Sequence, residues 1–249
     1  MQEWSSPVIV LNTRPYGETD GIVSVLSLEQ GLFRGLVKGM ISRRQISIWQ
    51  TGNFVNVDWS AKLSDQLGYF KGELIRSNFA ILSPCPLAFS AMLSLCAVAE
   101  SGLLERQPVE YIAKSSFQYL DFVAENPTDS NKEIVPRLLR WELNFLAALG
   151  YALDISICYE SDKCQSLFVS PRTGKVVTEV MAGKWKPKLF PFPSFFLNEE
   201  ENGNQKDWMN GLKLSRYFLE KNVFSLINKD LPRARKNFEE KVAANIDNF

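Results

Sequence analysis

The strict alternation of residues Phe54–Leu63 constrains the fold more than any other feature of the chain. In FVNVDWSAKL, apolar residues such as Val55 and Val57 alternate with polar residues such as Asn56 and Asp58. A period of two sends successive side chains to opposite faces, so one face is buried and the other is wet. This segment is therefore expected to form a β-strand.

Other β-like runs surround this strand in the first part of the chain. They are short, apolar or alternating, and bounded by Gly, Asn and Glu-Gln turns. Their sequences are PVIVLNTR, GIVSVLSL, LFRGLVK and GYFKGELIRS. Five short strands within residues 1–80 predict a small barrel of the oligonucleotide-binding (OB) class.

The pattern changes after Pro84 and Pro86, and residues 81–249 are expected to form a mostly helical domain. Leu87–Leu104 has apolar residues at helical spacing, and Gln107-Pro108 begins another helical segment. Further helices are predicted in EIVPRLLRWELNFLAALGY, from about Asp207, and in LPRARKNFEEKVAANI. The predicted fold class is therefore α+β, with an N-terminal five-stranded barrel followed by helices.

Composition excludes several classes of function. The chain has no histidine, which removes Ser-His-Asp triads, Cys-His pairs and histidine metal ligands. Its 28 basic and 28 acidic residues cancel, so any nucleic-acid site must be a local basic patch. Polar residues interrupt Leu87–Leu104, which favours a core helix over a membrane span. Without a signal-peptide pattern at the N-terminus, a cytoplasmic protein is expected.

Glycines recur in GETDGIVSVLSLEQGLFRGLVKG, residues Gly17–Gly39, but they match neither a Walker loop nor a dinucleotide fingerprint. Glycines in such a segment let a barrel strand bend. Glu199, Glu200 and Glu201 are consecutive, as in a solvated turn, whereas a two-metal nuclease needs carboxylates from rigid elements. We therefore expect no catalytic residues and no cofactor, with a metal-assisted nuclease as the disfavoured alternative of another class.

Basic residues gather at the end of the same segment. Arg34 and Lys38 lie four residues apart in one strand, so both are expected on one face. Arg43 and Arg44 are expected in the loop just beyond, and Arg14 lies at the end of the first strand. Such a group would neutralise phosphates in a groove. The spacing is equally compatible with an ordinary solvated strand.

A second set of arginines is scattered over the apolar helices: Arg137, Arg140, Arg233 and Arg235. This combination suits an acidic peptide that ends in hydrophobic residues. We therefore consider the helical domain as a possible protein-docking module. The basic run around Arg233 is equally compatible with a solvated helix start.

The cysteine spacing argues against a complete zinc site. Cys158 and Cys164 form C-x5-C, whereas structural zinc commonly needs four ligands in two closer pairs. The remaining two, Cys85 and Cys96, lie in or beside a helix elsewhere in the sequence. Four cysteines in a chain of this length also make no disulfide scaffold.

Several blocks, in order over almost the whole length, resemble the RecO family of bacterial recombination mediators. They are RPYGETDGIVSVLS, LFRGLVKG, SRR, TGNFVNVDWSAKLSDQLGYF, WELNFLAALGYALD, FVSPRTGKVVT and LPRARKNFEEKV. The resemblance implies an OB fold and a helical domain that carries a zinc-finger-like insertion at about residues 154–196. It also implies a protein of the bacterial nucleoid and not an enzyme.

The function implied by the resemblance is mediation of DNA repair and homologous recombination. Family members bind single- and double-stranded DNA and anneal complementary strands. They engage the acidic C-terminal tail of the single-stranded DNA-binding protein SSB, and with RecR they help RecA to displace SSB. A helical domain that acts mainly as an SSB-docking adaptor is the alternative within this class.

The resemblance also implies site residues. The family's basic DNA-binding surface matches Arg34, Lys38, Arg43 and Arg44, and more weakly Arg14. Metal-binding members have cysteine pairs in the insertion, where this chain has only Cys158 and Cys164. We therefore expect a degenerate finger that holds no metal.

Overall fold

The computed structural model describes residues 2–63, 65–127, 131–159 and 166–244. The chain divides into two compact units. Unit 1 comprises Met1–Asp129 and Pro232–Phe238, and unit 2 comprises Ser130–Leu231 and Glu239–Phe249. Each unit is described by itself. None of the described helices is both long and apolar enough to cross a membrane.

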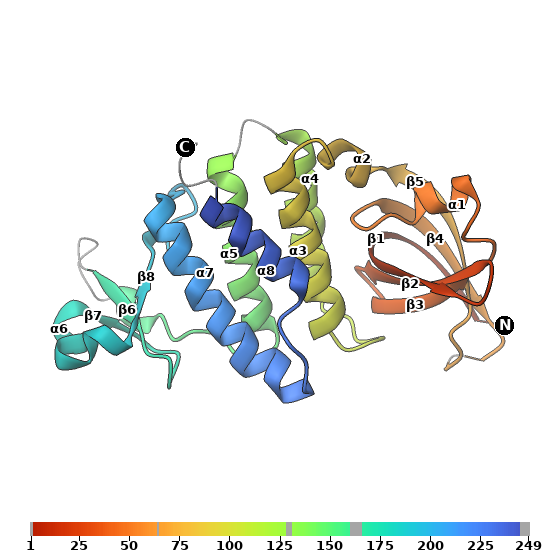
Figure 1. Cartoon of the computed structure of the whole chain (residues 1–249). Helices are drawn as coiled ribbons and strands as arrows, with labels where there is room; N and C mark the ends of the chain where they lie inside the picture. The colour runs from red at the N-terminus through yellow and green to blue at the C-terminus, as the bar shows by residue number, and fades with distance from the viewer. Residues whose placement is uncertain (1, 64, 128–130, 160–165, 245–249) are drawn as a thin grey trace. The chain divides into compact units, whose positions relative to one another are not determined.

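Unit 1 begins with a closed five-stranded barrel, as the alternating sequence predicts (Figure 1). The strand order is β1-β2-β3-β5-β4. All neighbouring strands are antiparallel except β3 and β5, which meet in parallel. The strands are β1 (Gln2–Tyr16), β2 (Asp20–Ser27), β3 (Gly31–Val37), β4 (Phe54–Ala61) and β5 (Tyr69–Arg76).

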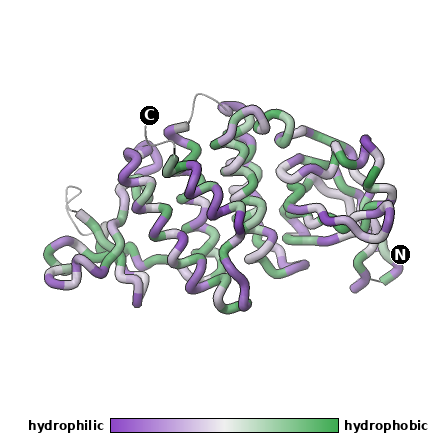
Figure 2. The backbone as a smooth tube through the Cα atoms, in the orientation of Figure 1, coloured by the Kyte–Doolittle hydropathy of each residue, from purple (hydrophilic) through white to green (hydrophobic). Residues whose placement is uncertain are grey.

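The barrel interior is filled by the inward-facing residues of all five strands. Apolar residues such as Val8, Val23 and Val57 are fully buried there. Aromatic rings complete the interior, and the Phe33 ring packs edge-on against the Trp59 ring at a centroid distance of 5.1 Å. Figure 2 accordingly shows frequent hydrophobic segments along the barrel strands. Burial of these side chains is the main favourable term that holds the barrel together.

Barrel closure between β3 and β5 depends on one residue pair. Leu36 pairs with Tyr69, and the Leu36 N–H donates to the carbonyl oxygen of Gly68 at 3.0 Å. Gly68 has a φ of +65°, and a Cβ there would lie 2.3 Å from the indole nitrogen of Trp59. Only glycine fits this combination of left-handed backbone and close packing.

Unit 1 also contains two short helices, α1 (Arg43–Ile48) and α2 (Asn78–Leu82), and two longer ones, α3 (Pro86–Gly102) and α4 (Glu110–Glu125). The prediction that Arg43 and Arg44 lie in a loop is wrong, because these residues begin α1. The Ser42 side chain caps this helix by accepting a hydrogen bond from the Gln45 N–H. Helix α3 packs on β1, where the Cys96 thiol lies 3.9 Å from the Val10 carbonyl oxygen.

Unit 2 contains two long helices that pack together, α5 (Asn131–Ala148) and α7 (Gln205–Leu219). After α7 follow a π-helical turn η4 (Glu220–Phe224) and η5 (Ser225–Ile227). Helix α8 (Arg233–Ala244) follows, and its residues are divided between the ranges of the two units.

Between α5 and α7, unit 2 carries a three-stranded sheet in the order β7-β6-β8. This segment falls within the predicted insertion at residues 154–196. Its elements are η1 (Ser156–Tyr159), β6 (Leu167–Val169), β7 (Val176–Thr178), α6 (Glu179–Ala182), η2 (Gly183–Lys188), β8 (Phe190–Phe192) and η3 (Ser194–Phe196). Cys164 and the side chain of Cys158 lie outside the described residues. The degenerate finger therefore stays a prediction.

The predicted domain boundary at residue 80 follows the change from strands to helices. The division into compact units instead keeps residues 81–129 with the barrel. Packing of α3 on β1 and hydrogen bonds from the barrel to the residues that follow α3 explain this grouping. The boundary near residue 80 stays a prediction about sequence domains.

Candidate nucleic-acid interface

The outer face of the barrel carries most of the residues predicted for DNA binding. In β3, Phe33 and Val37 face the interior, so Arg34 and Leu36 face outward. Strand register places Arg14 opposite Ile22, Ile22 opposite Leu36, and Leu36 opposite Tyr69. One row across the sheet therefore connects Arg14 on β1 with Tyr69 on β5.

Arg34 is engaged within unit 1. Its guanidinium donates to Glu105 at 2.6 Å, to Glu100 at 3.3 Å and to the Ser24 hydroxyl at 3.2 Å. Partial burial disfavours its charge, but hydrogen bonds and charges of Glu105 and Glu100 outweigh this and raise the pKa of Arg34. The three partners fix the side chain across strands and helix, which favours a structural role.

Lys38 differs from Arg34, although both are on the segment predicted to bind phosphate. It lies one residue beyond β3 and is exposed. Its ammonium lies 4.8 Å from the centroid of the Tyr69 ring. The turn after it is held by a hydrogen bond of 2.9 Å from the Gly39 N–H to the Asp20 carboxylate. Lys38 is therefore accessible to a ligand.

Arg43 and Arg44 are also exposed, at the start of α1. Neither forms a salt bridge with any residue that the structure describes, and the same holds for Arg14. We use the term basic surface for Arg14, Lys38, Arg43 and Arg44 together.

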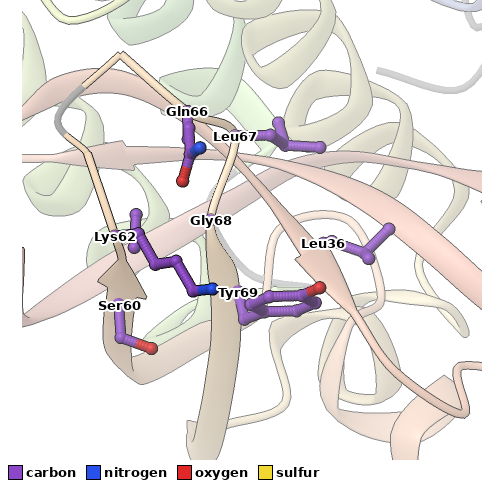
Figure 3. Close-up of a pocket in the computed structure, with 8 residues that line it drawn as sticks. Leu36, Ser60, Lys62, Gln66, Leu67, Gly68 and Tyr69 are labelled. Carbon is purple, nitrogen blue, oxygen red and sulfur yellow. The ribbon is translucent and has the colours of Figure 1, made fainter. Parts of the chain in front are cut away.

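Sequence reasoning missed two residues on the same side of the barrel. Lys62 follows β4 and Tyr69 begins β5, and both line a cavity of about 460 Å³ (Figure 3). The signal available in the sequence was a lysine and a tyrosine at the two ends of one inter-strand loop. That signal becomes specific only when barrel closure brings Leu36 against Tyr69.

Two of the arginines predicted for peptide docking are engaged within unit 2. The Arg140 guanidinium donates to the carbonyl oxygens of Phe195 at 2.7 Å and Asn198 at 3.2 Å. Burial lowers the pKa of Arg140. Arg137 donates to the Glu133 carboxylate one helical turn away, at 2.7 Å.

The other two predicted docking arginines lie in the part of unit 1 near the C-terminus. Arg233 is exposed, whereas Arg235 is fully buried. A fully buried side chain offers no surface to a partner. The structure therefore does not bring the four arginines together as one exposed group within either unit.

Unit 2 has another combination of apolar and basic residues, which we name the Trp185 surface. A cavity of about 470 Å³ is lined by Val177, Met181, Ala182, Trp185 and Leu189, with Arg172 and Lys188 also lining it. The Trp185 side chain is 55% exposed, and the Lys188 ammonium lies 5.2 Å from its ring centroid. Exposed tryptophan beside cations is typical of binding surfaces.

Comparison with known families assigns both parts of the chain. Residues 1–78 match the model of the recombination protein O N terminal, and residues 86–231 match that of the recombination protein O C terminal. The gap between the two matches, residues 79–85, contains all of α2 except Asn78 and ends just before α3 begins at Pro86.

Curated relatives match over nearly the full length. The chain is similar to the DNA repair protein RecO of Gluconacetobacter diazotrophicus, with 37% identity over 97% of this chain and 96% of that protein. It is 38% identical to the DNA repair protein RecO of Granulibacter bethesdensis, over 97% of this chain and 96% of that protein. The chain is 36% identical to the DNA repair protein RecO of Acidiphilium cryptum, over 98% of this chain and 97% of that protein. The chain therefore belongs to the recombination protein O family of bacterial DNA repair proteins.

Proposed function

We propose that this protein is a non-catalytic recombination mediator that binds single- and double-stranded DNA and anneals complementary strands. Together with RecR, it would help to load RecA onto DNA covered by SSB. Membership of the family supports the role in repair. The observation that carries the DNA-binding part is the exposure of the basic surface, in particular of Lys38, Arg43 and Arg44.

The proposed mechanism is electrostatic. Lysine and arginine side chains on the basic surface neutralise phosphates and release condensed counterions, which favours binding at low salt. Bringing two neutralised strands to one surface lowers the repulsion that opposes their pairing. Arg34 was predicted for the same task, but its bonds to Glu100 and Glu105 favour a role in holding the barrel to the end of α3.

A strand-annealing assay tests this proposal. Complementary oligonucleotides, one carrying a fluorophore and the other a quencher, are coated with SSB and mixed with the purified protein. We expect quenching without nucleotide or metal. Failure to bind or anneal either strand would contradict the proposal, and cleavage of a labelled strand in the presence of Mg²⁺ would support the nuclease alternative instead.

A second proposal concerns the partner protein. The Trp185 surface combines an apolar cavity with Arg172 and Lys188, which is the chemistry that an acidic tail with apolar end residues requires. We propose that unit 2 docks the SSB tail there. This site replaces the docking site predicted at the scattered arginines, because Arg137 and Arg140 already form hydrogen bonds within unit 2.

Fluorescence anisotropy with a labelled SSB tail peptide tests this docking. We expect weaker binding by Trp185→Ala and by Lys188→Glu. Lys213→Glu is the matched control, because Lys213 is an exposed lysine of unit 2 on helix α7. Equal affinity of all three variants and the wild type would overturn the assignment.

A further inference from the structure

The loop between β4 and β5 forms one wall of a pocket on the outer surface of the barrel. The pocket has a volume of about 460 Å³, within the range of about 300–1,000 Å³ that is usual for ligand sites. Its lining includes Leu36, Ser60, Lys62, Gln66, Leu67 and Tyr69. We name it the Tyr69 pocket.

The Tyr69 ring is the prominent feature of this pocket. The Tyr69 residue is 47% exposed, so its ring is accessible to a ligand. Lys38 places its ammonium 4.8 Å from the ring centroid. Lys62 lines the pocket together with Tyr69, and in the view of Figure 3 its side chain extends in the direction of the ring. An exposed aromatic ring thus contacts the Lys38 ammonium and lines the same pocket as Lys62.

Hydrogen bonds hold the backbone beneath the ring. The carbonyl oxygen of Gly68 accepts from the Leu36 N–H at 3.0 Å, at the point where the barrel closes. The Arg106 guanidinium donates to the Gln66 carbonyl oxygen at 2.6 Å and so restrains the preceding loop. A binding group on a fixed backbone loses little conformational entropy when a ligand arrives.

We propose that the Tyr69 pocket holds one unpaired nucleotide of a single DNA strand. The base stacks on the Tyr69 ring, and the flanking phosphates are neutralised by Lys62 and Lys38. Aromatic rings stack on any base, so this contact is independent of sequence. The position also fits, because the loop between the fourth and fifth strands is one of those with which OB barrels bind oligonucleotides.

Lys38 does not block this arrangement. A cation–π contact at an exposed site is weaker than stacking of a base on an aromatic ring. An incoming base therefore displaces the lysine from the ring, and the released ammonium can turn to a phosphate. The inference rests on the proposed DNA binding and deepens it, because it makes the site selective for bases that are out of the duplex.

Fluorescence anisotropy with a labelled oligothymidylate, an abasic strand of equal length and a duplex tests the pocket. For Tyr69→Ala we expect about 5- to 150-fold weaker binding of the oligothymidylate, the range that corresponds to loss of one stacked base. Binding of the abasic strand and the duplex should change little. Tyr69→Phe should retain the wild-type affinity, and Lys62→Ala should weaken binding of all three ligands.

Matched controls keep the outcomes separable. Tyr111→Ala removes another exposed tyrosine of unit 1, and Lys114→Ala removes an exposed lysine of the same helix α4. Failure of the wild type to bind any of the three ligands would overturn the proposed function itself. Normal wild-type binding with an unchanged Tyr69→Ala variant, or with equal losses on single strands and duplex, would overturn only the stacking site.

Discussion

The outer face of the barrel has two sides that differ in what lies against them. On the covered side, α3 packs on β1, and outward residues such as Leu26 and Leu32 are fully buried. Arg34 belongs to this side because it is bonded to Glu100 and Glu105. On the open side, Lys38 and Tyr69 are exposed.

The comparison shows that the spacing of two basic residues along a strand does not determine the function of either residue. Arg34 and Lys38 are four residues apart, and sequence reasoning gives both the same task. The structure supplies two carboxylates to Arg34, so its charge is satisfied inside unit 1. Lys38 contacts only the face of an aromatic ring among the interactions described for it, and its charge is available to a ligand.

The largest effect on the open side is expected from Gly68→Ala. The new Cβ would lie 2.3 Å from the Trp59 indole nitrogen, on a backbone with a φ of +65°. We expect a loss of roughly 2–4 kcal/mol in the free energy of unfolding, from overpacking and backbone strain together. Urea unfolding followed by tryptophan fluorescence measures it. Gly39→Ala is the control, since φ there is +63° but nothing lies within 4 Å. Equal losses in the two variants would mean that packing against Trp59 contributes nothing.

The second prediction concerns the exposed cations of the basic surface. A variant with Lys38→Ala, Arg43→Ala and Arg44→Ala should bind DNA more weakly. The slope of log affinity against log salt should fall by about 2 to 3, since each phosphate contact contributes about one. Titration of a labelled strand at several salt concentrations measures this slope. An unchanged slope, with Lys114→Ala as the control, would remove the basic surface from the DNA site.

The third prediction separates Arg34 from Lys38. Arg34→Ala leaves Glu100 and Glu105 without their guanidinium partner, so it should lower the free energy of unfolding by about 1–3 kcal/mol. Lys38→Ala should change stability by less than about 0.5 kcal/mol. DNA affinity should show the reverse order.

A double variant tests whether the ion pair with Glu105 explains the expected effect of Arg34→Ala on stability. Adding Glu105→Gln to Arg34→Ala should recover part of the lost stability, because it removes the carboxylate left behind. Large loss of DNA binding by Arg34→Ala with unchanged stability would return Arg34 to the DNA site.

The smallest effect is expected from Cys96 beneath α3 on the covered side. Burial raises the pKa of this thiol from 9.0 to about 12. The folded state therefore keeps a proton that the unfolded chain releases, so stability is complete below pH 9.0 and falls as pH rises towards 12. At about one pH unit above the pKa of the thiol in the unfolded chain, we expect the free energy of unfolding to be lower by about 1.4 kcal/mol.

Comparison of Cys96→Ala with Cys85→Ala isolates this dependence on pH. Unfolding in urea at neutral and alkaline pH should show a shallower alkaline loss for Cys96→Ala than for the wild type. Cys85→Ala, which removes a half-buried thiol, should follow the wild type. Identical pH profiles for all three proteins would show that Cys96 becomes accessible before unfolding.

Much of the fold could be predicted from sequence, because it depends on local periodicity. The alternation in residues 54–63 predicts β4, and the apolar spacing of Leu87–Leu104 predicts α3. The helix at Arg43 could not be predicted in this way, because it has only six residues and a single buried one, Ile48. Its Ser42 cap was the available signal.

The candidate site was less predictable than the fold. Basic residues could be located, but their partners come from distant segments: Arg34 meets Glu105, 71 residues away. In the sequence, nothing distinguishes Tyr69 from other residues at the start of a strand. It lines a pocket only because β5 pairs with β3 in the closed barrel. Arg235 has the sequence context of an exposed helix start, yet it is buried.

The sequence by itself determined the barrel, the helices and the family, since strand and helix periodicity and ordered motifs are local properties of the chain. Only the tertiary structure decided which charges are available. Burial and ion pairing depend on which distant residues meet, and one register pair, Leu36 with Tyr69, brings a ring and two lysines to the open side. Arg34 and Lys38 therefore differ because Glu100 and Glu105 reach only one of them.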